Sequence, residues 1–439
     1  MYTKGLTYLY WVILLYKPDW MLSHYFSFFG FLPRINIFIL IITFLSTFFI
    51  DSSKKEFKFL LPFLIICLFS LFFARNTGIG RPFLKLLFQY YMLGVITLTY
   101  FDKFQDMKSL MICFLFHFSY YCIWGIFNGG ITPWHIRLNE TNAFGPYIIL
   151  GISFSFFYSF GTRKLYEKIT CYINIFLGLL NVALTFTMGS FLTLIFTGLY
   201  ILIRFPRKMK AISILAALVG IYVLCVNLFL PESSSYWQEM ARMKTDFGKS
   251  SAGGERLFLW RIAFREFIDH PFFGVGLNNF GILAPEYTTD LEVQSAQVSW
   301  SHRGNLWGFS LHNSHLVVLT ELGLFGIFFY LFLFVDFFKK NRFIKNILPM
   351  NGGPSLALNT LKNQHSEFPD MVLAYAIAMA LEGGLMVYII SGTFYGLLFY
   401  PDFWMILICN RLLFSSLNFY VFDSQFKKQH YGMSANPSN

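Results

Sequence analysis

Long runs of apolar residues recur along almost the whole chain, and they constrain its fold more than any other feature. The run INIFILIITFLSTFFI, at residues 35–50, contains no charged residue. Only 13% of the 439 residues are charged, against about 25% in a soluble domain. A helix of roughly 20 apolar residues spans a bilayer. The sequence therefore predicts an all-α polytopic membrane protein. A β-barrel would instead show alternating segments of about ten residues.

The apolar runs predict about twelve transmembrane helices. We expect them at residues 4–16, 35–50, 58–74, 83–100, 109–127, 143–160, 170–188, 190–203, 211–230, 314–337, 371–391 and 394–414. Lys and Arg are concentrated in the loops on one side, which predicts that this side is cytoplasmic, and an even number of spans places both termini there. The first run lacks a small-residue cleavage site, so we interpret it as a retained span. The whole chain, 1–439, is then a single membrane domain.

Three longer segments are expected outside the bilayer. Residues 231–311 form a long periplasmic loop between spans nine and ten. Residues 338–370 form a cytoplasmic loop rich in Gly, Pro and Asn, and residues 415–439 form a cytoplasmic tail whose end, KKQHYGMSANPSN, is predicted to be disordered. Long loops without structure of their own are uncommon and usually functional. The loop 231–311 is therefore the place where we expect the chemistry.

Charge and cysteine positions argue against several other kinds of function. The net charge is +11, but the excess lies in loops beside the membrane, so we expect membrane lipids and no nucleic acid as partners. The six cysteines all lie within apolar runs and form no CxxC motif, which disfavours disulfides and a zinc site. No GxxxxGK[ST] motif suggests the use of ATP.

An amphipathic helix is predicted in the long loop at residues 255–270. The sequence SSAGG precedes it and Pro271 ends it. On a helical wheel, Arg261 and Arg265 share a polar face with Asp269, and Arg265–Asp269 is a predicted i,i+4 ion pair. Two interpretations remain open for this face: a helix on the membrane surface with its arginines at lipid phosphates, or a substrate-binding surface.

Arg256 falls on a different side of the same wheel, within an apolar arc that includes Trp260 and Phe264. A cation on a face expected to be buried needs an anionic partner. A planar guanidinium suits phosphate, which it binds as a fork. The sequence therefore predicts that Arg256 binds an anionic substrate group. The Gly-x-Gly that follows, in FFGVGLNNF, opens no strand-to-helix nucleotide site, so we expect a tight turn that packs the helix onto the spans.

His312 and Asn313 stand where the long loop meets the tenth predicted span. An imidazole can accept a proton from a hydroxyl near neutral pH, so His312 is a candidate general base, and a structural histidine is the alternative. Glu321 and Glu382 lie within predicted spans and should face the bundle interior. Further candidate substrate-binding residues on the same side are Arg81, Arg137, His302 and Arg303.

Two groups of these residues form a pattern that resembles the O-antigen ligase and polymerase (Wzy_C-like) superfamily of polytopic membrane glycosyltransferases. The first, R-x-x-L-W-x-x-A…H-P-x-x-G-x-G-x-x-x-F, runs from Arg256 to Phe280. The second, H-N-S-x-L…L-x-E-x-G-x-x-G, runs from His312 to Gly326. NETNA, at residues 139–143, is similar to the family's approach to its sixth span. MGSFL, at residues 188–192, departs from the family, which commonly carries an arginine between spans seven and eight.

The resemblance implies a metal-independent, inverting glycosyltransferase without a cofactor, in a bacterial inner membrane with its active face in the periplasm. The donor would be an undecaprenyl-diphosphate-linked glycan. The acceptor would be a lipid A core sugar for a ligase, or a second lipid-linked glycan for an O-antigen or exopolysaccharide polymerase. His312 would activate the acceptor hydroxyl, and Arg256, with Arg137 and Arg81, would hold the diphosphate and stabilise it as the leaving group. From the sequence itself, Arg261, His302, Arg303 and Asn313 are further candidate substrate-binding residues.

Two alternatives come from other functional classes. A lipid-linked glycan flippase or other transporter should keep its polar residues near the middle of the bilayer, often at broken helices. A membrane scaffold would need no chemistry at all. Because the polar residues are concentrated in one outer loop, the sequence favours an enzyme, with ligase preferred to polymerase.

Overall fold

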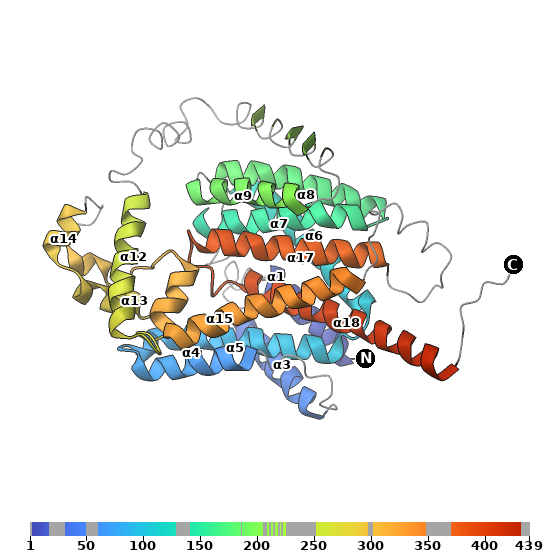
Figure 1. The fold of residues 1–439 in the computed structure, drawn as a ribbon, viewed down its shortest axis with the longest axis horizontal. Helices are drawn as coiled ribbons and strands as arrows, with labels where there is room; N and C mark the ends of the chain where they lie inside the picture. Colours follow the sequence, from blue (N-terminus) through green and yellow to red (C-terminus); the bar gives the residue numbers. More distant parts are fainter. Residues whose placement is uncertain are drawn as a thin grey trace.

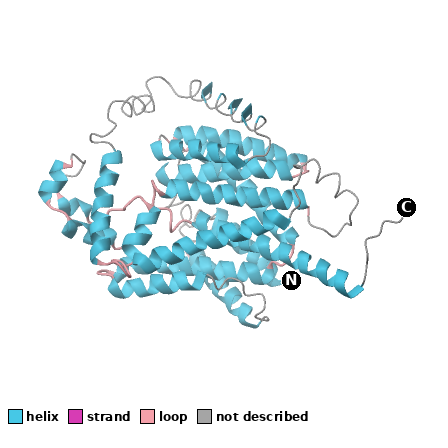
Figure 2. Cartoon of the chain, viewed as in Figure 1, coloured by secondary structure: helices cyan, strands magenta, loops and turns pink. Residues whose placement is uncertain are grey.

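The computed structural model describes residues 2–16, 31–49, 60–128, 141–185, 187–204, 252–296, 302–347 and 370–431, together with isolated positions between 209 and 224. Within these ranges all regular secondary structure is helical (Figure 2). The long helices lie side by side as a bundle (Figure 1). They are α1 (Tyr2–Tyr16), α3 (Leu32–Ser46), α4 (Leu61–Phe73), α5 (Thr77–Tyr100), α6 (Phe104–Phe127), α7 (Thr141–Gly161), α8 (Leu165–Leu184), α9 (Met188–Arg204), α15 (Ser314–Ile347), α17 (Met371–Gly392) and α18 (Pro401–Tyr431).

By length and composition, six of the described helices can cross a membrane. They span Thr77–Tyr100, Phe104–Phe127, Phe144–Gly161, Leu165–Leu184, Ser314–Asn346 and Met371–Gly392. Shorter apolar helices occur at Arg34–Ser46, Leu61–Phe73 and Gly189–Arg204. The chain is thus a multi-pass membrane protein. Every predicted span overlaps one of the bundle helices except 211–230, most of which lies outside the described residues. The count of twelve spans stays a prediction.

Two helices extend further than the sequence suggested. α15 continues to Ile347, into the range predicted as the loop 338–370, and α18 continues to Tyr431, into the tail predicted to be disordered. Basic side chains near a C-terminus favour continued helix, because they interact with the last carbonyl groups. Lys345 is such a residue in the last turn of α15. The charged residues in these two segments therefore do not mark the ends of α15 and α18.

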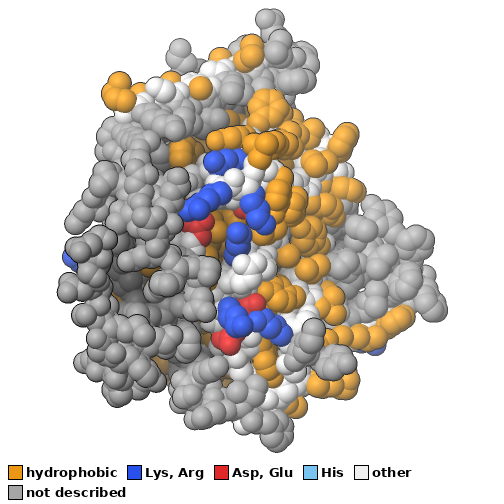
Figure 3. All heavy atoms as spheres, turned by 90° about the vertical axis from the view of Figure 1, so that its right-hand side faces the viewer, with side chains coloured by type: hydrophobic (Ala, Val, Ile, Leu, Met, Phe, Trp, Pro, Cys, Tyr) orange, Lys and Arg blue, Asp and Glu red, His pale blue; other side chains and the backbone are white. Residues whose placement is uncertain are grey.

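The helix ends meet at two opposite ends of the bundle. Lys4 in α1 donates to Asp106 at the start of α6, at 2.6 Å. The hydroxyls of Ser46 and Tyr100, at the ends of α3 and α5, are 2.5 Å apart. Lys and Arg side chains gather at the end of the bundle that contains these two contacts (Figure 3). We call this end, marked by Lys4 and Asp106, the basic end.

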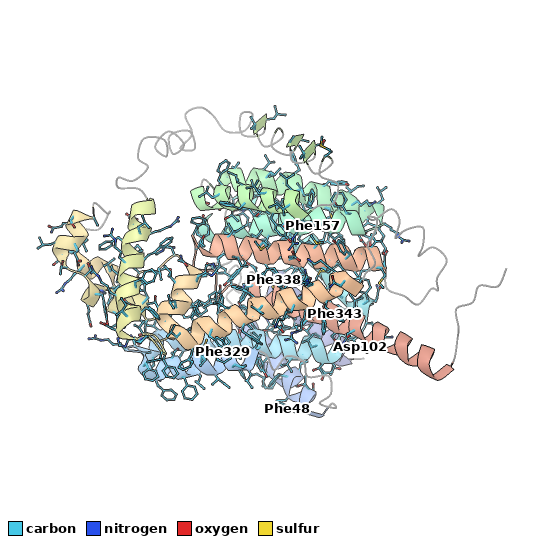
Figure 4. The ribbon with its side chains drawn as sticks, in the orientation of Figure 1. Phe48, Asp102, Phe157, Phe329, Phe338 and Phe343 are labelled. Atoms are coloured by element: carbon cyan, nitrogen blue, oxygen red, sulfur yellow. The ribbon has the colours of Figure 1, made fainter. Side chains whose placement is uncertain are left out.

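Aromatic side chains run from the core to the surface of the bundle (Figure 4). Phe157 of α7 is 4% exposed, whereas Phe48 is 61% exposed, as expected where lipid covers the outer surface. Inside the bundle, Glu382 of α17 is buried and lies 2.8 Å from the guanidinium of Arg204. Its other oxygen accepts from the amide of Asn341 at 2.6 Å. The interior position predicted for Glu382 is confirmed, and its contacts join α9, α15 and α17.

One longer helix, α12, and four short elements gather at the end opposite the basic end (Figure 1). They are α12 (Ala252–Asp269), α13 (Phe280–Leu283), η5 (Ala284–Tyr287), α14 (Asp290–Ser295) and η6 (Arg303–Leu306), which together we call the loop module. α12 confirms the helix predicted at 255–270. It lies across the axes of the bundle helices and packs on α15.

α15 is broken at Gly323, where φ is 67° and ψ is −162°. The segment after α12 pairs with the backbone groups around the break. Leu324 donates its N–H to the carbonyl of Pro271 at 2.7 Å, and Gly276 donates to the carbonyl of Glu321 at 3.0 Å. Irregular backbone at membrane depth is tolerated where protein satisfies its hydrogen bonds. The Gly-x-Gly therefore packs the loop onto a span, as predicted.

Gly274→Ala should destabilise the protein strongly. Gly274 has φ of +68°, and a Cβ there would overlap the backbone of Glu321. The left-handed backbone alone costs an alanine about 1–2 kcal/mol, and the overlap adds to that. The expected result is a clear fall in the midpoint of thermal unfolding in detergent. Gly304→Ala is the matched control, because within the described residues, its chain neighbours aside, no atom lies within 4 Å of a Cβ added there. Equal midpoints for the two variants would contradict this packing.

Candidate active site at the mouth of α15

His312 is fixed in an unusual backbone conformation just before α15. Its φ is 50°, in the left-handed region that few residues other than glycine adopt. Its N–H donates to Ser310 Oγ at 3.5 Å, and its half-buried ring meets Phe309 edge-on, with centroids 6.2 Å apart. Such strain persists where neighbouring structure imposes it, often at functional sites.

The two residues after His312 anchor this backbone. The side-chain oxygen of Asn313 accepts from the N–H groups of His315 and Leu316, both at 3.0 Å, and so caps α15. Ser314 Oγ donates to the carbonyl of Tyr395 at 2.8 Å. The start of α15 is thereby tied to the connection between α17 and α18. Asn313 has a structural role here, and its predicted substrate contact stays a prediction.

Arg256 approaches the same connection from α12. Its guanidinium carbon lies 5.7 Å from the centroid of the Tyr395 ring, a cation–π contact. The backbone of Tyr395 meanwhile accepts the N–H of Ser314 at 3.1 Å. Arg256 and the residues directly after His312 thus contact two parts of one tyrosine. The first and second parts of the sequence pattern meet at Tyr395 and again at the break in α15.

Tyr395 is a site residue that the sequence did not identify. Its side chain is 2% exposed, and its hydroxyl lies against Gly189, where any Cβ would overlap it. Gly189, in the sequence MGSFL at the start of α9, thus leaves room for the Tyr395 ring. No signal in the sequence marks this position, because Tyr395 is one of 25 tyrosines in an aromatic-rich chain.

The other predicted substrate-binding residues lie in several places. Arg261 is exposed on α12, and His302 and Arg303 are exposed beside α14, where the Arg303 N–H donates to Asp290 at 2.8 Å. Arg81 is exposed on α5. Arg137 lies outside the described residues. The contacts at Tyr395 involve Arg256 and none of these four described residues.

α12 packs through a different face from the one the wheel predicted. Its buried face carries Phe258, Ile262 and Glu266, while Leu257 is 56% and Phe264 49% exposed. The wheel identifies the most apolar side of a helix. At the end of a membrane protein, lipid as well as protein can cover an apolar side, so that side need not face the core.

The predicted Arg265–Asp269 pair is also wrong. Arg265 lies 2.8 Å from Glu292 of α14 and donates to the carbonyl of Tyr287 at 2.9 Å. Hydrogen bonds from Arg265 and from the backbone of Thr289 lower the pKa of Glu292 to about 2. The contact crosses 27 residues of chain, so no spacing rule along one helix could have found it.

Glu266 is an unexpected carboxyl group on the packed face of α12. It is 0% exposed, and within the described part of the chain neither oxygen has a hydrogen-bond partner. Burial, with smaller contributions from Glu321 and Glu286, raises its pKa to about 9. The side chain is therefore neutral at pH 7.

Glu266→Gln should stabilise the protein increasingly as pH rises. The unfolded chain releases this proton near pH 4.5, whereas the folded protein holds it until about pH 9. Stability is therefore lost across that window as pH increases, by about 1.4 kcal/mol per unit, or roughly 3 kcal/mol at pH 7. Thermal unfolding between pH 5 and 8 should show a flatter profile for the variant. Glu255→Gln, on the same helix, should keep the wild-type slope; parallel profiles for all three proteins would refute the argument.

Residues 173–331 match the family model described as Wzy_C, O-antigen ligase. The match confirms the resemblance seen in the sequence pattern. It extends from α8 to the middle of α15, so it includes Arg256 and His312 but neither Arg81 nor Arg137. None of the curated proteins matches the chain.

Proposed function

We propose that this membrane protein is an O-antigen ligase-type glycosyltransferase. It would move a glycan from undecaprenyl diphosphate to a hydroxyl of a lipid A core sugar. The observation that carries the proposal is the meeting at Tyr395, where Arg256 contacts the ring and the segment after His312 contacts the backbone. Arg256 and Ser314, which lies two residues after His312, contact the same residue, and this supports a shared site for the proposed cation and base. The match of residues 173–331 to the O-antigen ligase family supports the reaction class.

His312 is the proposed general base. The acceptor oxygen attacks the anomeric carbon of the donor's first sugar while its proton passes to the imidazole. The bond from that carbon to the diphosphate oxygen breaks, and its electron pair leaves with undecaprenyl diphosphate. One displacement inverts the anomeric centre. Base catalysis of this kind typically contributes a factor of about 10²–10⁴ in rate.

Arg256 is the proposed stabiliser of the leaving group. A guanidinium stays charged at physiological pH and can donate two parallel hydrogen bonds to a phosphate. Stacking on the Tyr395 ring limits the orientations open to Arg256, so less entropy is lost when phosphate binds. The donor's own diphosphate provides the energy for transfer, which fits a chain without a nucleotide motif.

The proposed orientation follows from the distribution of charge. The basic end would face the cytoplasm. The first described helix begins there, at Lys4, and the last one, α18, ends on the same side (Figure 1). The loop module would then face the periplasm of a bacterial inner membrane, where lipid-linked glycans are presented. This orientation places Arg256 and His312 on the periplasmic side.

The break in α15 is the one observation that favours a transporter, because broken helices often form transport sites. Here, however, the backbone at the break is bonded to the segment after α12. The buried carboxylate of Glu321 accepts the N–H of Asn278 at 2.6 Å. These contacts give the break a structural role, so we prefer the proposed glycosyltransferase to a transporter.

Complementation of ligase-null and polymerase-null cells tests the proposal, with the glycan ladder read on a gel. Restoration in the ligase-null cells alone is the expected result. Restoration in the polymerase-null cells alone would establish the O-antigen or exopolysaccharide polymerase alternative. Failure in both, with protein present in the membrane, would contradict glycan transfer to either acceptor in those hosts.

A further inference from the structure

The outer face of α12 is apolar and exposed. Leu257, Phe264 and Ile268 are 56%, 49% and 71% exposed. At 3.6 residues per turn they lie within about 40° of one another, so they form one stripe along the helix. We call these three residues the outer stripe of α12. The opposite side of the helix, with Ile262 and Glu266, is buried against the protein.

The cations of α12 lie to one side of the outer stripe. On a helical wheel Arg261 and Arg265 are about 40° and 80° further round than Leu257. Arg265 pairs with Glu292 of α14, and α14 lies further from the bundle than α12 does (Figure 1). The arginine side of α12 therefore faces away from the bundle. The outer stripe, about a quarter turn from Arg265, faces sideways.

α12 lies across the axes of the bundle helices (Figure 1). When those helices cross a membrane, α12 lies parallel to the membrane surface. An interfacial helix buries its apolar side about 5–10 Å into the boundary between lipid headgroups and acyl chains, and it carries Lys or Arg on its polar side. The order of side chains around α12 is that of such a helix.

The outer stripe also continues the exposed apolar surface of α15. After its break, α15 exposes Leu324, Phe328 and Leu331, which are spaced as one helix face. Phe272, just after α12, is exposed as well, and its ring centroid lies 6.2 Å from that of Phe325 on α15. Lipid covers the exposed face of a membrane span. The same lipid therefore reaches the end of α12 without an intervening polar surface.

We propose that the outer stripe of α12 is seated in the lipid leaflet on the loop-module side of the bundle, at the boundary between headgroups and acyl chains. The ligand is bilayer phospholipid. Its acyl chains contact Leu257, Phe264 and Ile268, and its phosphates accept hydrogen bonds from Arg261, which is exposed. Of the two roles that the sequence leaves open for Arg261, lipid binding is then preferred to substrate binding. α12 also holds Arg256, one residue before the stripe, at the height of the lipid headgroups.

Lipid crosslinking tests the position of α12. The crosslinker p-benzoylphenylalanine replaces Leu257 or Phe264 in the full-length protein, in nanodiscs of phosphatidylethanolamine and phosphatidylglycerol with radiolabelled acyl chains. We expect both positions to take up label as efficiently as position Phe328 of α15. Leu291 is the matched control, because it is 78% exposed but lies on α14, further from the bundle. It should take up roughly a tenth of the label or less, since it lies outside the depth of an interfacial helix.

The crosslinked product identifies what covers the outer stripe. Label at Leu257 and Phe264 no higher than at Leu291 would overturn the proposal. The same variants irradiated in cell membranes detect other occupants: a crosslink mainly to a second copy of the chain, or to a different protein, would overturn it as well. Unfolding midpoints equal to that of the wild-type protein check that the variants are folded.

Thiol labelling in the same nanodiscs provides a second measurement. Leu257→Cys should react with a water-soluble maleimide roughly tenfold more slowly than Leu291→Cys, because lipid shields it from water. The wild-type protein gives the background from the native cysteines, four of which are buried in the described part of the chain. Equal rates would contradict the proposed seat of α12. Neither measurement needs a glycan donor or acceptor, so both are independent of the proposed reaction.

Discussion

His312→Asn should abolish glycan transfer while the protein remains folded in the membrane. Asparagine is chosen because it tolerates the left-handed backbone that His312 adopts, so the substitution removes the imidazole without adding strain. The acceptor hydroxyl then lacks a base. The expected fall in the transfer rate is about 10²–10⁴-fold. The ladder in complemented cells and single-turnover transfer by purified protein both measure it.

His270→Asn is the matched control for this experiment. His270 is exposed directly after the end of α12, on the same end of the molecule, and takes the same substitution. It should retain near wild-type transfer and the same unfolding midpoint. If His312→Asn kept more than about a tenth of wild-type activity, His312 would be structural and the base would have to be another group.

The parts of this fold that could be predicted are those fixed by local sequence. Apolar runs marked the bundle helices, since the bilayer requires them. Pro271 marked the end of α12, and the polar pair His312–Asn313 marked the start of α15; the start of α12 was placed too late, because the helix includes Ala252, Gly253 and Gly254. Each of these signals depends on a few neighbouring residues, so one sequence was sufficient.

The parts that could not be predicted depend on contacts between distant segments. Arg265 pairs with Glu292 and not with Asp269, because α14 folds back onto α12. Glu266 is buried although it is a carboxylic acid, because the packed face of α12 is set by α15 and not by α12 alone. Tyr395 joins the site through a connection more than 70 residues after α15 begins. Hydrophobic patterning carries no information of this kind.

The glycines of the sequence pattern are visible in the sequence, but the reason for their positions is seen only in the fold. Gly274 and Gly323 are far apart in sequence, yet a Cβ on either would overlap the backbone beside the other. Both have positive φ. The glycines in H-P-x-x-G-x-G and L-x-E-x-G therefore belong to one contact, in which the segment after α12 packs on α15 at its break. This contact and Tyr395 together hold Arg256 and His312 in relation to the bundle.

Arg256→Lys should fail to restore the function that Arg256→Ala loses. Alanine removes the cation at the leaving group, and we expect kcat to fall about 10²–10³-fold, as when a group that stabilises developing charge is deleted. Lysine keeps the charge but lacks the planar fork and stacks poorly on Tyr395. We therefore expect the lysine variant to recover little of kcat, although its KM for donor should improve relative to alanine.

Arg34→Lys and Arg34→Ala provide the matched pair, since Arg34 is an exposed arginine at the start of α3, outside the proposed site. Both should transfer glycan normally. The wild-type protein and the Arg256→Lys variant carry the same charge at this position and differ only in the geometry of the charged group. The ratio of their kcat values therefore measures what the two parallel hydrogen bonds of the guanidinium and its contact with the Tyr395 ring contribute. Full activity in Arg256→Lys would mean that a point charge is sufficient, and Tyr395 would then be a packing residue without a part in orienting the leaving group.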